Sequence, residues 1–215
     1  SASFGESKFY GGSIAFFSLL CKQMGGSMQI IQHRRALHQI PELDRDLPET
    51  LAYLRKVLTP LGCTLSSPIP GALCAFFDFG RAEAIAFRSD ADALPIQEAN
   101  EVEYISRHEG IMHACGHDAH TAMLLGAARV LSENKERIPG TVRLLFQTDE
   151  EGSRGAERTI KEGGIQGADA VFGTHIGTIL SKDIPSGTMV CTPGCCMASF
   201  DKFVIRVKGN GCHGS

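Results

Sequence analysis

Apolar residues recur along the chain at two spacings, one typical of amphipathic helices and the other of buried strands. Within residues 47–61, apolar side chains stand at positions 51, 54, 57, 58 and 61, which places them on one face of a helix. Pro48 suits the first turn of such a helix, and Gly62 follows its end. Similar patterns predict shorter helices over 30–37, 121–131 and 156–162.

Short apolar runs predict strands that alternate with these helices. They cover residues 73–79, 84–87, 141–146 and 169–172. This alternation is typical of the α/β class, so we predict a three-layer sandwich with a mostly parallel sheet. The weakly alternating residues 203–207 predict the first strand of a separate unit, and a Gly-rich segment follows them.

Composition narrows the classes of partner. The 215 residues are 43% hydrophobic and 21% charged, with a net charge of −3, and no basic run is longer than Arg34-Arg35. We therefore expect no nucleic-acid partner. The apolar run 14–21 is too short to span a bilayer, so we expect no membrane partner. We assign residues 1–29 to an N-terminal extension. The eight cysteines are scattered, which favours a reducing compartment, and we expect a cytoplasmic protein.

Residues 112–120 concentrate groups that bind metals or protons. Five of these nine residues are Cys, His or Asp, and Cys115 and His117 flank Gly116. A bend at the glycine would let the thiol and the imidazole meet a common cation. The structural alternative is a buried Cys115 beside a helix-capping Asp118, with His117 on the surface. The later sites at Glu150-Glu151 and His175 favour the metal.

Both later sites follow predicted strands, and so does the pair Asp90 and Asp92. Open α/β sheets bind ligands at the carboxyl ends of their strands, so these groups are expected to converge. Adjacent carboxylates can divide their roles, one binding metal while the other holds a proton near neutral pH. Either aspartate could orient a ligand histidine. Thiolate with imidazole suits zinc, whereas carboxylate with imidazole admits manganese, cobalt or nickel.

Five motifs, in order, resemble the amidohydrolases that cleave N-acyl amino acids, including hippurate hydrolase and the indoleacetyl-amino-acid hydrolases. These enzymes belong to the aminoacylase/carboxypeptidase-like dinuclear metallopeptidases. The motifs are Arg35-Ala-Leu-His38 with Pro41-Glu42, Arg88 to Pro95, Met112 to His120, Gly140 to Gln147 with Glu150-Glu151-Gly152, and Gly173-Thr-His175. A sixth segment, Asp201 to Gly214, is similar to the start of the family's α+β lid.

The resemblance implies hydrolysis of an N-acyl amino acid by a water held between two divalent metal ions. Manganese or zinc is expected, with cobalt or nickel as alternatives. Glu150 would be the general base, Asp92 an orienting residue and His213 a lid histidine. The metal ligands would be Cys115, His117, Glu151 and His175.

The resemblance also implies a domain layout and an oligomeric state. Residues 30–195 would form an incomplete zinc-peptidase-like catalytic domain, and residues 196–215 would begin a lid through which the complete protein dimerises. We therefore expect the chain to be an N-terminal portion that is poorly active alone. The alternative is a non-catalytic metal-binding or assembly module that retains the fold.

The chain also departs from the family's pattern. Thr148-Asp149 stands where the family usually has Pro-Ala, and Ala91 replaces a common Met. We expect the extra carboxylate of Asp149 to perturb the pKa of Glu150. A zinc nucleobase deaminase is excluded, because the chain lacks the His-x-Glu and Pro-Cys-x-x-Cys motifs of that class.

Overall fold

The computed structural model divides into two units, Ser1–Gly177 and Thr178–Ser215. It describes residues 27–80, 84–138, 140–152, 154–177, 181–191, 193–194, 203–209 and 211. Residues 1–26 of the expected N-terminal extension therefore lie outside the described residues, and so does His213.

The first unit is built on one five-stranded sheet with the order β1-β2-β4-β3-β5. β3 pairs in parallel with β4 and β5, whereas β2 pairs antiparallel with β1 and β4. Only β2 therefore runs against the other four strands, which confirms the α/β class and the mostly parallel strand direction. The strands are β1 (Thr64–Ser66), β2 (Leu73–Phe77), β3 (Ala84–Asp90), β4 (Thr141–Gln147) and β5 (Ala170–Gly173).

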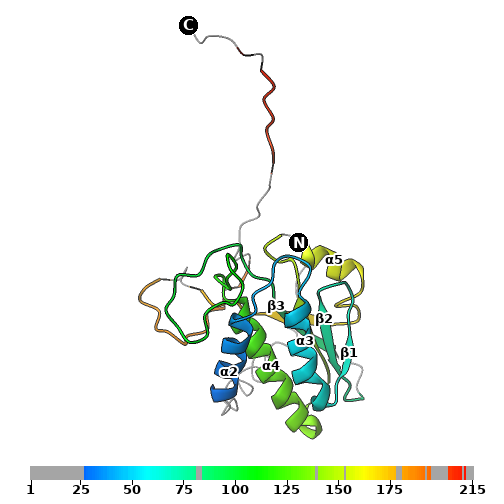
Figure 1. Cartoon of the computed structure of the whole chain (residues 1–215). Helices are drawn as coiled ribbons and strands as arrows, with labels where there is room; N and C mark the ends of the chain where they lie inside the picture. Colours follow the sequence, from blue (N-terminus) through cyan, green and yellow to red (C-terminus); the bar gives the residue numbers. More distant parts are fainter. Residues whose placement is uncertain are drawn as a thin grey trace. The chain divides into compact units, whose positions relative to one another are not determined.

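Helices cover both faces of this sheet. On one face lie α2 (Ser27–His38), α3 (Pro48–Leu58) and α4 (His117–Glu133), with short 3₁₀ turns at Thr59–Leu61 and Lys135–Arg137 (Figure 1). Their apolar sides pack on alternate residues of the strands, among them the fully buried Leu144. The intervening Arg143 faces the opposite side, where its Nη1 donates to the carbonyl of Gly164, 2.9 Å away, just after α5 (Gly155–Lys161).

The start of α3 illustrates how sequence signals set the element boundaries. Pro48 occupies the first turn, as predicted. The carboxylate of Glu42 accepts hydrogen bonds from the amides of Glu49 and Thr50 at 3.0 and 2.8 Å, and so caps the positive end of the helix. Gly62 follows the 3₁₀ turn in the left-handed conformation, with φ of 72°.

Two predicted boundaries and one predicted strand were wrong. α4 begins at His117 rather than at 121, so the site histidines lie in its first turn and not in a preceding loop. β3 continues through polar residues to Asp90, because these pair with β4. The described residues 203–209 form no strand, and Phe203 is 80% exposed, since no neighbouring strand pairs with this segment within the described residues.

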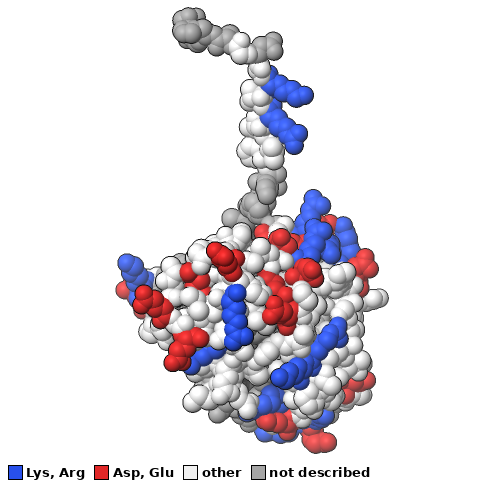
Figure 2. All heavy atoms as spheres, viewed as in Figure 1, with Lys and Arg blue, Asp and Glu red and all other residues white. Residues whose placement is uncertain are grey.

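On the face shown in Figure 2, acidic and basic side chains are interspersed and do not form separate patches of one charge. The cysteines at 63, 74, 115 and 191 are free thiols. Among the helices that the structure describes, none has the length and apolar character needed to cross a bilayer.

Candidate metal centre

The predicted metal ligands lie in the segments after β4 and β5 and at the start of α4. β3 and β4 are paired in parallel up to Asp90 and Gln147, and β5 ends beside Arg88. The segments that follow these strands therefore leave the sheet at the same edge. Glu150, Glu151 and His175 lie in them, beside the first turn of α4.

Gly116 brings Cys115 and His117 together. Its φ of 95° is left-handed, a conformation that glycine adopts without strain and that starts α4 with a sharp bend. Glycine is also required by space, because a Cβ at this position would lie 2.7 Å from Cδ1 of Ile176. With this bend, one potential ligand atom each from Cys115, His117 and Glu151 lie within 4.8 Å of one another.

His117 presents one ring nitrogen to this point. Its Nδ1 lies 2.9 Å from the carbonyl oxygen of Asp92, and a carbonyl can only accept, so Nδ1 carries a proton and Nε2 has a lone pair when the ring is neutral. Nε2 is buried 3.7 Å from Oε1 of Glu151. Neither atom has a hydrogen-bond partner among the described residues. Two buried polar atoms that face each other without a hydrogen bond fit a cation.

His175 is oriented in a similar way. Its Nδ1 donates to the carbonyl of Ile176, and its Nε2 lies 3.4 Å from Sγ of Cys115. Burial raises the pKa of the Cys115 thiol to about 12, and the neighbouring carboxylate of Glu151 adds to this effect. A divalent cation would reverse that shift by stabilising the thiolate. The donor set of thiol, two imidazoles and carboxylate therefore fits a transition metal.

The predicted orienting residue, Asp92, contacts this site through both backbone and side chain. Its carbonyl lies nearest to His117, while its carboxylate Oδ1 is 3.6 Å from the same Nδ1. Its Oδ2 accepts a hydrogen bond from the amide of Glu151 at 3.0 Å. One buried residue thus contacts the segments carrying two predicted ligands.

Glu150 lies at the mouth of the site. Its side chain is 40% exposed, and Oε2 is 3.8 Å from Nε2 of His117. Partial burial raises the pKa of its carboxyl above the usual value, and the charge of Asp90 adds to this. A carboxyl with a raised pKa suits a group that accepts and returns a proton.

Asp149 is not among the main groups that shift the pKa of Glu150. Its buried carboxylate forms ion pairs with the guanidinium groups of Arg45 and Arg158, at 3.0 and 3.2 Å. The main electrostatic effects on Glu150 come from Asp90 and His117 instead. Asp149 has a left-handed φ of 59°, and it joins the end of β4 to α5 rather than adding charge to the site.

Sequence reasoning assigned no role to His120, which forms a second cluster of potential ligands with Asp90, His117 and His175. Asp90 Oδ1 is 2.6 Å from Nδ1 of His120. Burial alone would raise the pKa of Asp90, but the hydrogen bond from His120 and the charge of Arg88 outweigh it and lower that pKa to about 2. Asp90 and His120 both stand in motifs rich in ionisable residues, which was the available signal.

The first turn of α4 is also tied to α2 by buried polar contacts. His38 lies 2.7 Å from the carboxylate of Asp118 and 3.0 Å from that of Glu98. Arg34 joins Asp118 at 2.9 Å. The hydrogen bond to Asp118 raises the pKa of His38 despite its burial. These contacts hold the residue next to His117 in place.

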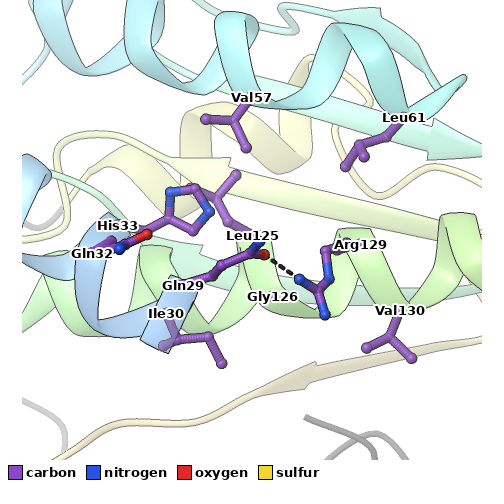
Figure 3. Close-up of a pocket in the computed structure, with 10 residues that line it drawn as sticks. All are labelled: Gln29, Ile30, Gln32, His33, Val57, Leu61, Leu125, Gly126, Arg129 and Val130. Atoms are coloured by element: carbon purple, nitrogen blue, oxygen red, sulfur yellow. Dashed lines mark hydrogen bonds between the residues drawn. The ribbon is translucent and has the colours of Figure 1, made fainter. Parts of the chain in front are cut away.

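A cavity of about 290 Å³ lies elsewhere, between α2, α3 and α4 (Figure 3). Its lining is mainly apolar, and the polar His33 and Arg129 are already bonded to Tyr53 and Gln29. None of the predicted metal ligands lines this cavity, so it is not the candidate reaction site.

Comparison with known proteins finds relatives that match most of this chain. N-acetyl-L-cysteine deacetylase of Bacillus subtilis is 45% identical over 188 residues, which cover 86% of this chain and 44% of the relative. IAA-amino acid hydrolase ILR1-like 5 of Arabidopsis thaliana is 39% identical over 84% of this chain and 41% of its own length. The chain spans about half the length of the curated relatives it matches, or less.

A solved structure gives the same family. A dinuclear metal binding peptidase of the M20 family from Bacillus subtilis superposes with a TM-score of 0.67 and 37% identity, over 71% of this chain and 44% of that one. The model of peptidase family M20/M25/M40 matches residues 86–207. This match includes the ends of β3, β4 and β5 and the whole of α4, and the chain belongs to the peptidase family M20/M25/M40.

Proposed function

We propose that the protein is a metal-dependent amidohydrolase that cleaves the amide bond of N-acyl amino acids. The observation that carries this proposal is the pair of buried atoms without hydrogen bonds, Nε2 of His117 and Oε1 of Glu151, beside the thiol of Cys115 and Nε2 of His175. The names of the relatives, which include an N-acyl-L-amino acid amidohydrolase from Geobacillus stearothermophilus, support the substrate class.

The proposed ligands are Cys115, His117, Glu151 and His175, and two manganese or zinc ions are the proposed occupants. When bound, such ions supply Lewis-acid polarisation of the substrate carbonyl. The residues of the chain orient the ligands and transfer the proton. The carbonyl of Asp92 fixes the tautomer of His117, and the short contact with Ile176 does the same for His175.

Glu150 is the proposed general base. Its carboxylate takes a proton from water as the water oxygen bonds to the amide carbon. It then passes that proton to the amine nitrogen as the carbon–nitrogen bond breaks, leaving a carboxylic acid and a free amino acid. The raised pKa of Glu150 suits it to hold the proton between the two steps.

The remaining assignments extend this proposal to the complete protein. Residues 30–195 would form the catalytic domain, and 196–215 would begin a lid that contributes His213 and mediates a homodimer. A cytoplasmic location is proposed from the cysteine pattern.

Replacement of Glu150 tests the proposal. We expect Glu150→Gln to lower the rate of N-acyl amino acid hydrolysis by about 100-fold or more, because general base catalysis contributes that much. Metal content, measured by elemental analysis, should be unchanged. Glu157→Gln is the matched control, because Glu157 is exposed and pairs only with Lys161 among the described contacts.

The assay should use the chain and the longest natural form that contains it, with a panel of N-acyl amino acids and added manganese or zinc. Retained hydrolysis in Glu150→Gln would refute the role of Glu150. Full metal loading without hydrolysis of any panel member by the unmodified protein would favour the non-catalytic module.

A further inference from the structure

We propose that His120 is a positioning residue that holds His175 in the metal site, acting through the backbone of Ile176. This inference rests on the proposed ligand set, in which His175 binds metal. It assigns to His120 a role distinct from that of a ligand, although its ring lies among the potential ligands Asp90, His117 and His175.

Both nitrogens of His120 are already engaged. The amide of Ile176 donates to Nε2 at 2.9 Å, so Nε2 must carry a lone pair. The proton of the neutral ring then lies on Nδ1, which faces Oδ1 of Asp90 at 2.6 Å. His120 could bind a metal through Nε2 only by giving up the bond to Ile176. The observed contacts favour a link between backbone segments.

The anchor at the other end of this link is rigid. Asp90 ends β3 and is 1% exposed, and its Oδ2 pairs with Arg88 at 2.9 Å. Its carbonyl accepts a hydrogen bond from the hydroxyl of Thr121 at 2.9 Å. His120 is itself 2% exposed in the first turn of α4. The imidazole is therefore fixed by strand and helix before it meets the Ile176 amide.

His175, in contrast, needs external support. β5 ends at Gly173, and residues 174–177 have no regular secondary structure and are exposed. The rings of His120 and His175 meet edge to face with centroids 4.4 Å apart. Ile176 also packs against Gly116. The bond from His120 thus fixes the backbone directly after the proposed ligand, and a ligand displaced from its position binds metal less tightly.

Two amide substitutions separate the functions of the ring. In His120→Gln the side-chain oxygen can take the place of Nε2 and accept from Ile176. In His120→Asn the shorter amide can take the place of Nδ1 and keep only the contact with Asp90. We expect His120→Asn to weaken zinc affinity about 10- to 100-fold, and His120→Gln to restore most of that loss. Zinc affinity is measured by titration against a competing chelator, and circular dichroism verifies that both variants fold.

A double-substitution cycle with His175→Ala identifies the route. If His120 acts through His175, the variant His120→Asn/His175→Ala binds zinc as His175→Ala alone does. Additive losses would show that His120 acts independently of His175 and would overturn the inference, as would unchanged affinity in His120→Asn. Unchanged affinity in His175→Ala would instead overturn the proposed ligand set.

Discussion

Substitution of Gly116 by alanine perturbs the bend that brings Cys115 and His117 together. Gly116 has a φ of 95°, and an added Cβ would lie 2.7 Å from Cδ1 and 2.8 Å from Cγ1 of Ile176. A left-handed backbone costs a residue with a Cβ about 1–2 kcal/mol. Ordinary carbon–carbon contact is about 3.5–4.0 Å, so Ile176 must also move by about 1 Å.

The two effects have different consequences. Backbone strain lowers the free energy of unfolding, by about 1–3 kcal/mol in total. Displacement of Ile176 moves the neighbouring His175 away from Cys115, so we also expect a zinc affinity about tenfold weaker or worse. Gly110→Ala is the matched control, because Gly110 has a φ of 73° and nothing lies within 4 Å of the position that the added methyl group would take.

Urea unfolding and zinc titration of both variants separate strain from damage to the site. We expect both variants to lose stability and only Gly116→Ala to lose zinc affinity. If Gly116→Ala bound zinc as tightly as the control and unfolded at the same urea concentration, the close approach of Ile176 would have no role in shaping the site.

Two further predictions concern charge. Because the metal-free Cys115 thiol has a pKa near 12, it is protonated at neutral pH and must release its proton to bind zinc, so affinity should rise with pH. The slope of log affinity against pH should fall by about one in Cys115→Ser; an unchanged slope would mean that the thiol is not a ligand. Asp149→Asn should lower the free energy of unfolding by about 1–3 kcal/mol, measured in urea, because the buried carboxylate loses charged bonds to Arg45 and Arg158. An unchanged free energy of unfolding would show that these contacts do not stabilise the protein.

Elements with strong local signals were predictable from the sequence. The apolar face of α3, its Pro48 and the terminal Gly62 specify that helix without reference to the rest of the fold. β4 is mainly apolar apart from Arg143, and it is buried along almost its whole length. The convergence of Glu151 and His175 followed from the rule that parallel strands end at one edge of a sheet. The Cys-Gly-His spacing placed Cys115 and His117 together.

Features that depend on tertiary contacts were not predictable. β1 has only three residues and exists through its pairing with β2. The first turn of α4 is polar, so apolar periodicity could not include it, and its histidines are buried by contacts made across the fold. Asp149 reads as one more acid beside Glu150, and only the structure reveals the two arginines that pair with it.

X-ray absorption at the zinc edge of the zinc-loaded protein tests the central claim most directly. If Cys115 joins the imidazoles and the carboxylate around a cation, the spectrum contains a sulfur scatterer at about 2.3 Å. That scatterer disappears in Cys115→Ser. A shell of only nitrogen and oxygen in the unmodified protein would contradict the account.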